Sequence, residues 1–309
     1  MRKAAPIIAV IVAMIIWAGS GIAVKEALSV FTPLSLIILR FSLAVTLMLL
    51  TGLIFKRNNL LGLQKIDKAD IGYFLLGGFF QPFIYFILET YTYRALSSPT
   101  IAEAFLSTNP IIAPVFAWVF LREHITRNNI IGIVVSTIGM LALTLAGSTD
   151  FELGNPWGVP LALVTVCSAA AYSTILKKIP DKYSPITIVF TTQLISLCLF
   201  IPLWAIVDDP AMLFATLSEG VGAIQTSLLG VGYLGVFSSV VAFVLFCYCV
   251  RDIGVSQANV FNNIRPVFTA ILMLILFSEH LPVLKWIGMG LIIIGLFISQ
   301  KKEKQLNSL

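Results

Sequence analysis

Ten apolar stretches, most of them a little over 20 residues long, follow one another along this 309-residue chain. They run at approximately 5–24, 34–55, 71–93, 99–121, 129–147, 156–176, 184–207, 223–250, 256–278 and 282–300. A helix of about 20 apolar residues crosses the hydrocarbon core of a bilayer. Because the breaks between the stretches are short, no separate soluble domain fits between them. The sequence therefore predicts an all-α membrane protein with ten transmembrane helices.

The composition agrees with this prediction and excludes other classes. Only 11% of the residues are charged and 58% are hydrophobic, whereas soluble domains carry about 25% charged residues. The net charge of +5 is therefore interpreted as a sign of orientation, and no nucleic-acid partner is expected. The cysteines lack the spacing of a metal or redox motif, so no metal and no cofactor are expected. We interpret them as packing residues: Cys167, Cys198, Cys247 and Cys249.

The basic residues predict which side of the membrane each loop occupies. With the amino terminus placed inside, 15 of the 20 basic residues lie in segments 1–4, 56–70, 122–128, 177–183, 251–255 and 301–309. Lys25, Arg94 and Lys285 lie on the other side, and Arg40 and Arg265 fall within apolar stretches. Loops rich in lysine and arginine stay in the cytoplasm. Both termini are therefore predicted to be cytoplasmic, with the chain in the cell membrane.

The two halves of the chain repeat one another. Residues 102–124 align without gaps on residues 258–280, at an offset of 156, and the offset is about 152 nearer the start of each half. The matches are Lys25 with Lys177, Pro33 with Pro185, Pro110 with Pro266, Gly132 with Gly288, and Gly139 with Gly295. A unit of five spans is odd, so the second copy enters the membrane from the opposite face. We therefore expect one membrane domain of two inverted repeats, residues 1–148 and 149–309, as in many secondary transporters.

Several segments resemble a known family when taken in order and spacing. They are "IIWAGSGIAVKEAL", "PLSLIILRF", and the block "LSTNPIIAPVFAWVFLREHITRNNIIGIVVSTIGMLAL" with its echo in the second half. Over nearly its whole length the chain is similar to the drug/metabolite transporter superfamily, specifically its EamA-type ten-helix permeases. The resemblance implies transport of small metabolites by alternating access. It also implies that helices one, three, four, six, eight and nine line a cavity, that two and seven flank it, and that five and ten are peripheral.

Four ionisable residues lie well inside the apolar stretches, and they are the first candidates for function. They are Arg40, Glu89, Glu103 and Arg265. Each costs on the order of 3 kcal/mol at the centre of a membrane helix, so two acids and two bases predict pairing. The sequence does not assign the pairs. Arg40 is interpreted as part of a gating or structural pair, because it lies on a flanking helix.

The third stretch carries a polar stripe of Gln81, Tyr85 and Glu89. Their spacing of four residues places them on one face of a helix. We interpret this face as the lining of a substrate cavity. The alternative is that the three side chains only form hydrogen bonds between helices.

The fourth and ninth stretches each hold polar residues around a proline. Pro110 and Pro266 predict helix breaks at corresponding positions, and irregular backbone at membrane depth is tolerated beside a wet cavity. Ordinary proline kinks are the alternative. The associated substrate-binding candidates are Glu103, Asn109, Asn259, Asn262, Asn263 and Arg265. Glu103 could instead favour a helix start through the dipole, and Arg265 could belong to a structural ion pair.

Three further binding candidates lie on the first and sixth stretches: Trp17, Ser20 and Tyr172. Aromatic rings at mid-membrane depth can stack on planar or cationic substrates, whereas aromatic residues otherwise favour the membrane interfaces. Glu123-His124 and Glu279-His280 end the fourth and ninth stretches. We interpret these two pairs as anchors of helix ends.

The mixed charges point to a secondary transporter for a small polar or amphipathic metabolite, an amino acid or a related compound. An acid would meet the ammonium group and an arginine would meet the carboxylate. An exporter of drugs or cations is the alternative, and it would call for more aromatic residues and an unpaired acid. An intramembrane enzyme is not expected, because no nucleophile lies with a base at suitable depth. The expected partners are the substrate, the lipid bilayer, and protons as a coupling ion through Glu89 or Glu103.

The predicted orientation can be tested by labelling single cysteines in a cysteine-free background. An impermeant thiol reagent applied to intact cells should leave Gly62→Cys and Gln305→Cys unlabelled, because both positions are predicted to be cytoplasmic. Asp150→Cys, in a predicted outer loop, is the control that should react. Labelling at position 62 or 305 in intact cells would show that the inside assignment is wrong.

Overall fold

The computed structural model describes residues 4–55, 62–123, 125–145, 153–218, 224–277 and 282–300, and the regular elements in these ranges are helical. In chain order they are α1 (Ala4–Ala27), α2 (Pro33–Ile54), α3 (Ile71–Gly78), η1 (Phe79–Ile84), α4 (Tyr85–Ala95), α5 (Pro99–Leu106), α6 (Asn109–Leu121), α7 (Arg127–Leu145), α8 (Gly158–Lys178), α9 (Pro185–Val207), α10 (Pro210–Ser218), α11 (Gln225–Tyr233), η2 (Leu234–Ala242), α12 (Phe243–Ile253), α13 (Val255–Val260), η3 (Phe261–Ile264), α14 (Arg265–Phe277) and α15 (Val283–Gln300).

These helices confirm the prediction of an all-α, multi-pass membrane protein. By length and composition, 8 helical stretches of the described chain can cross a membrane. The apolar helices at 127–142 and 283–299 are shorter, so the count of ten crossings and the orientation stay predictions. The short helix α10 was not predicted as a separate element. It begins at Pro210 after Asp208 and Asp209, where the charged pair ends the apolar run of α9.

Three of the long segments begin in the same way, with a hydroxyl residue followed by proline. The hydroxyl accepts the backbone N–H three residues on, and proline in the first turn has no N–H to leave unsatisfied. The caps are Thr32 on Ser35 in α2, Ser98 on Ile101 in α5, and Ser184 on Thr187 in α9. These local signals fix where the helices enter the bundle.

Within the described residues, four of the candidate membrane spans are interrupted. The third passes through the π-helical turn η1, where Gln81 has an extended backbone (φ −147°, ψ 116°), and the eighth through the longer π-helical segment η2. The fourth breaks between α5 and α6, and the ninth contains the 3₁₀ turn η3. The expectation of a continuous helix that presents Gln81, Tyr85 and Glu89 as one stripe is therefore wrong at Gln81.

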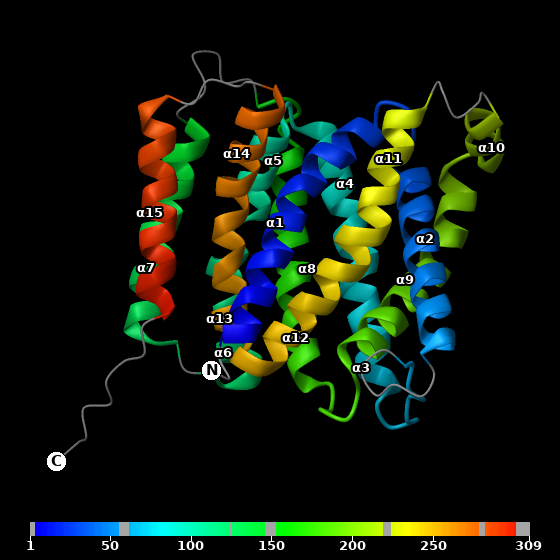
Figure 1. Cartoon of the computed structure of the whole chain (residues 1–309), viewed down its shortest axis with the longest axis horizontal. Helices are drawn as coiled ribbons and strands as arrows, with labels where there is room; N and C mark the ends of the chain where they lie inside the picture. The colour runs from blue at the N-terminus through cyan, green and yellow to red at the C-terminus, as the bar shows by residue number, and fades with distance from the viewer. Residues whose placement is uncertain are drawn as a thin grey trace.

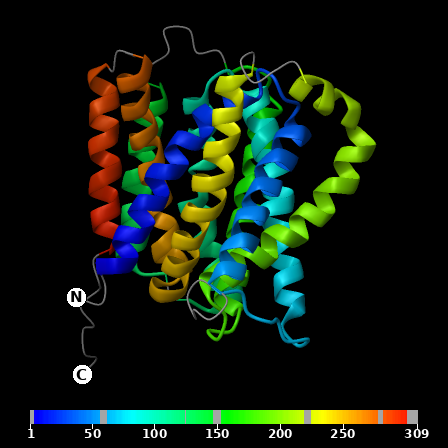
Figure 2. The same cartoon turned by 45° about the vertical axis from the view of Figure 1, so that its right-hand side comes forward.

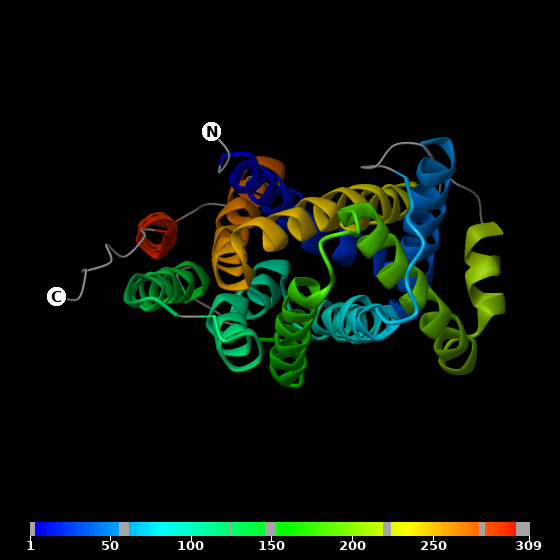
Figure 3. The same cartoon turned by 90° about the horizontal axis from the view of Figure 1, so that it is seen from below.

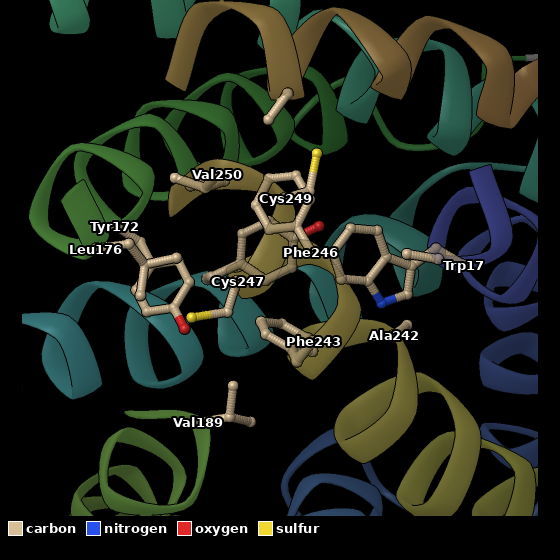
Figure 4. Close-up of a cluster of buried hydrophobic side chains, with 14 of the residues drawn as sticks. Trp17, Tyr172, Leu176, Val189, Ala242, Phe243, Phe246, Cys247, Cys249 and Val250 are labelled. Atoms are coloured by element: carbon tan, nitrogen blue, oxygen red, sulfur yellow. The ribbon is translucent and has the colours of Figure 1, made fainter. Parts of the chain in front are cut away.

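The long helices stand side by side as a bundle (Figures 1 and 2). Seen from below, α7 and α15 form one edge, and α9 and α10 lie at the opposite edge (Figure 3). The largest apolar core joins α1, α2, α8, α9 and α12, and Figure 4 shows part of it around Phe243 and Phe246. The interrupted segments therefore meet in the middle of the bundle, where a site can be enclosed.

Glu123 lies two residues after the end of α6 and binds the start of α13. Its carboxylate accepts hydrogen bonds from the backbone N–H groups of Val255 (3.4 Å) and Ser256 (3.3 Å) and from the Ser256 hydroxyl (3.0 Å). An acid at a helix N-terminus is favoured by the helix dipole. This contact agrees with the interpretation of Glu123 as an anchor. His124, Glu279 and His280 lie outside the described residues.

Small residues bring α7 and α15 into close contact at the edge of the bundle. A methyl group added at Gly132 would lie 2.5 Å from the carbonyl oxygen of Gly295, and one at Gly139 would lie 2.6 Å from that of Gly288. The two helices are thus antiparallel and pack backbone against backbone. Because lipid is as apolar as the side chains, such close packing is a principal source of helix association in membranes.

This packing predicts that one added methyl group destabilises the pair. Gly139→Ala should lower the free energy of unfolding by on the order of 1–3 kcal/mol, because a backbone carbonyl cannot move aside freely. Gly290→Ala on α15 is the matched control, since a methyl group there meets no described atom within 4 Å. The measurement is thermal unfolding of both variants in detergent. Equal melting temperatures would contradict the close contact.

Candidate functional site

A small polar cavity lies where the four interrupted segments meet. Its volume is about 30 Å³, which is room for little more than a water molecule. Each interruption contributes to its wall: Gln81 from η1, Asn109 from the start of α6, Ser238 from η2 and Asn262 from η3. The remaining lining residues are Trp17, Ser20, Arg40, Tyr85, Phe86, Glu89, Leu106, Ala169, Ser173, Phe243, Phe246 and Arg265.

The two repeat-related prolines begin new helices beside this cavity. Pro110 and Pro266 each stand second in their helix, directly after Asn109 in α6 and Arg265 in α14. Proline is well tolerated there, because the first N–H groups of a helix have no partner within it. The start of α6 therefore borders the cavity with the positive end of its dipole, whereas α14 continues directly from η3, where the Arg265 N–H donates to the Asn262 carbonyl.

Arg265 and Glu103 form an ion pair inside the bundle. Arg265 Nη2 donates to Glu103 Oε1 at 2.9 Å, and the two side chains are 6% and 0% exposed. The Tyr93 hydroxyl donates to the same Glu103 oxygen. Glu103 Oε2 and Arg265 Nε are buried and have no hydrogen-bond partner in the part of the chain that the structure describes. The pair is therefore compensated in charge but incomplete in hydrogen bonding.

Arg40 and Glu89 form the second buried ion pair, and hydroxyl groups bond to both of its members. Arg40 Nη1 lies 3.8 Å from Glu89 Oε2, and the Tyr85 hydroxyl donates to Glu89 Oε1 at 2.9 Å. The guanidinium also donates to the hydroxyls of Ser239 (2.7 Å) and Ser238 (2.9 Å) in η2. The charge of Arg40 is thus met by groups from two other segments, α4 and η2. The structure thereby assigns both pairs that the sequence left open.

Amides from the two halves of the chain also meet. Asn109 Nδ2 donates to Asn259 Oδ1 at 2.7 Å, and Asn259 Nδ2 donates to the Val255 carbonyl at 2.9 Å. Asn262 Nδ2 bonds the backbone carbonyl of Asn259 at 3.1 Å. The side chains of the ninth segment therefore satisfy carbonyl groups next to its break, as buried backbone in a membrane requires.

Aromatic rings form the apolar wall of the cavity. The Trp17 ring lies 5.2 Å from the rings of both Phe243 and Phe246 (Figure 4), and its Nε1 donates to the Ser238 carbonyl at 3.2 Å. The Arg40 guanidinium lies 4.1 Å from the centre of the Phe86 ring. Such a wall can enclose an apolar side chain beside the charged groups.

Most of the predicted binding residues line the cavity, and four do not. Those that line it are Trp17, Ser20, Gln81, Tyr85, Glu89, Asn109, Asn262 and Arg265, together with Arg40. Glu103 and Asn259 lie behind the wall as partners of Arg265 and Asn109, and Asn263 is buried next to Asn262. Tyr172 packs against Phe243 and lies near Cys247 (Figure 4), and it is not among the residues that line the cavity.

Sequence reasoning missed part of the lining. Phe86, Phe243 and Phe246 look like ordinary apolar residues, and Ser173 has no charged neighbour in the sequence. Ser238 and Ser239 could have been found, because two adjacent hydroxyls inside an apolar stretch are potential partners for a buried arginine.

Comparison with known families identifies the kind of protein that contains this site. The sequence model of the EamA-like transporter family matches residues 4–145 and again residues 156–300. The chain belongs to the EamA-like transporter family. It is accordingly a multi-pass membrane transporter.

Several similar proteins of comparable length are named as transporters. An uncharacterized transporter of Archaeoglobus fulgidus is 25% identical, over 93% of this chain and 95% of its own. The uncharacterized inner membrane transporter YedA of Escherichia coli K12 is 24% identical, over 96% of this chain and 91% of its own. One protein of known crystal structure shares the fold with a TM-score of 0.72 and 17% identity, over 100% of this chain and 99% of that one.

This EamA-like transporter has a larger but apolar cavity of about 410 Å³ between α3, η1, α6 and α8. Its walls include Leu76 and Phe120, which are 50% and 55% exposed. In a bilayer such side chains face lipid hydrocarbon. A binding site needs convergent polar groups, so the small cavity between the helix breaks is the candidate site.

Proposed function

We propose that this EamA-like transporter carries an amino acid, or a related small zwitterion with an apolar side chain, across the cell membrane by alternating access. The proposal rests on the buried ion pairs of Arg265 with Glu103 and of Arg40 with Glu89, which lie where four helix breaks meet. Arg265 binds the carboxylate of the substrate, with the starts of α6 and α14 beside it. Glu89 and Tyr85 meet the ammonium group, and the rings of Trp17, Phe243 and Phe246 enclose the side chain.

Charge balance favours a zwitterion over an ion. The two arginines and two glutamates are compensated within the bundle, and a zwitterion offers an opposite charge to both kinds of group, a carboxylate to Arg265 and an ammonium group to Glu89. A cation would need an acid without a basic partner, and both acids have one. Uncompensated charge in a dry interior is strongly unfavourable. This argument separates the proposal from an exporter of drugs or cations.

The contacts between the halves support an inverted repeat. At the offset of 156, Gly132 corresponds to Gly288 and Gly139 to Gly295. In the structure Gly132 faces Gly295 and Gly139 faces Gly288. Each contact is thus the copy of the other with the partners exchanged, which is the pattern of a two-fold related interface. Inverted halves of this kind underlie alternating access in many transporters.

Two lysines at corresponding positions close opposite ends of the bundle. Lys25 Nζ donates to the Leu96 carbonyl at 2.6 Å, where α1 meets the end of α4. Lys177 Nζ donates to the Arg251 carbonyl at 2.8 Å, where α8 meets the end of α12. With both contacts formed, the cavity is too small for a metabolite. In the proposed cycle one contact opens at a time.

The substrate assignment predicts a specific loss at Arg265. Arg265→Lys should fold but bind L-phenylalanine about ten- to hundredfold more weakly, because Lys lacks the planar fork that matches a carboxylate and a charged hydrogen bond contributes roughly 1.5–3 kcal/mol. The measurement is affinity in reconstituted vesicles, with melting temperature as the check on folding.

Two analogues with a single charge sharpen this test. Hydrocinnamate keeps the carboxylate and phenethylamine keeps the amine, and both should bind more weakly than L-phenylalanine. Tight binding of phenethylamine alone would favour a cation exporter instead. Unchanged affinity of Arg265→Lys with lowered stability would make Arg265 a structural residue.

The lysine contacts predict opposite shifts in access. A cysteine at Ser173, in the cavity wall, should react faster with impermeant reagent from outside in Lys25→Met and faster from inside in Lys177→Met. Each hydrogen bond contributes on the order of 1 kcal/mol, so several-fold changes in rate are expected. Lys68→Met, at an exposed lysine, is the control. Shifts in the same direction would contradict the assignment of the two contacts to opposite faces.

A further inference from the structure

The ion pair of Arg265 and Glu103 has an uncharged copy in the same molecule. At the offset of 156, Glu103 corresponds to Asn259 and Asn109 corresponds to Arg265. The contact between residues 103 and 265 therefore corresponds to the contact between residues 259 and 109. Both contacts are present: the first is an ion pair at 2.9 Å, and the second is an amide pair at 2.7 Å.

This correspondence acts as an internal control for what the fold requires. The uncharged pair of Asn109 and Asn259 joins the start of α6, next to the break after α5, to α13. The equivalent packing in the other half could be satisfied in the same way, and burying an ion pair is often no more stabilising than a neutral contact. The packing of the helices at this place therefore does not by itself require the charges of Glu103 and Arg265.

The bonding of Glu103 distinguishes it from the other buried acid. Each oxygen of Glu89 faces a partner: Oε1 accepts the Tyr85 hydroxyl at 2.9 Å, and Oε2 lies 3.8 Å from Arg40 Nη1 in an ion-pair contact. Glu103 receives both of its bonds, from Arg265 and Tyr93, on Oε1, and its Oε2 has no partner among the described side chains. Among the described residues, the charged and titratable groups that interact with Glu103 are Arg265 of α14 and, from α4, Tyr93, Glu89 and Tyr85. Arg265 is the cation among them.

One guanidinium can compensate one carboxylate. When the carboxylate of a substrate binds to Arg265, the charge that compensated Glu103 is shared with a second anion. Glu103 is completely buried, and an uncompensated carboxylate there is strongly unfavourable. Taking up a proton on Oε2 removes this charge and leaves Oε1 able to accept the Tyr93 hydroxyl.

We propose that Glu103 is the proton-binding residue of the transport cycle, which takes up one proton when a substrate carboxylate binds to Arg265 and releases it when the substrate leaves. The proton and the substrate then cross the membrane together, in the same direction. By linkage, each must strengthen the binding of the other. This inference rests on the proposed function, since it needs a substrate with a carboxylate.

Calorimetry can count the protons directly. L-phenylalanine is titrated into the purified full chain in two buffers that differ in ionisation enthalpy, which gives the number of protons taken up per molecule bound. The wild type should take up about one proton, and its affinity should rise by up to about tenfold for each unit by which the pH falls. Glu103→Gln should bind without proton uptake and with an affinity that does not depend on pH.

Two further variants make the result specific. Glu26→Gln, at an exposed carboxylate at the end of α1, is the matched control and should take up protons like the wild type. The double variant Glu103→Asn, Arg265→Asn copies the amide pair of the other half. It should fold with a melting temperature within a few degrees of the wild type and should not bind L-phenylalanine.

The outcomes separate this inference from the proposed function. If L-phenylalanine binds without proton uptake, the role of Glu103 is overturned and the proposed function stands. The same holds if proton uptake persists in Glu103→Gln, or if it disappears in Glu89→Gln instead. Failure of the double variant to fold shows that the charges are structural and also overturns this role. If the wild type binds neither L-phenylalanine nor hydrocinnamate, the proposed substrate class is wrong, and the role of Glu103 falls with it.

Discussion

Compensation of buried charge inside the membrane is the constraint on which the rest of this structure depends. Two guanidinium groups and two carboxylates lie at depths where hydrocarbon offers them no partner. The protein supplies partners from segments far apart in the sequence: Glu103 for Arg265, and Glu89 with the hydroxyls of η2 for Arg40. Each pair therefore ties several helices together, and the helices can meet only in the arrangement that satisfies both pairs.

The helix interruptions follow from the same constraint. A regular helix keeps its own backbone bonds and presents only side chains, whereas a broken one brings helix ends and carbonyl groups to the interior. The break before Pro110 places Asn109 at a helix start, and the 3₁₀ turn before Arg265 does the same in the other half. Polar side chains such as Asn262 then satisfy the carbonyls that the break exposes. Polar groups and irregular backbone in this protein thus stabilise one another, away from lipid.

How far the sequence predicts this site depends on the kind of signal. The length of the apolar stretches predicted the helical membrane fold. The four ionisable residues within them indicated the site in the middle of the bundle, because such residues are rare in contact with hydrocarbon. The breaks at Pro110 and Pro266 carry a proline, and so does η1 with Pro82. The π-helical segment η2 contains no proline, and its effect on Ser238 and Ser239 could not be predicted from local sequence. The pairing of the charges depends on three-dimensional packing, which sequence spacing does not encode.

The close packing of α7 against α15 has a consequence for how this protein can move. These helices belong to different halves of the chain, and so do α2 and α9, which are joined at the opposite edge by bonds from Thr32 and Ser35 to Asp208 and from Trp204 to Ser35. Contacts across the halves at both edges therefore oppose their separation as two rigid bodies. The packing leaves bending of the interrupted segments as the available motion, with η1, η2, η3 and the gap before α6 as the joints. The half-helices on either side of the cavity would then be the moving parts, inside a frame that stays closed.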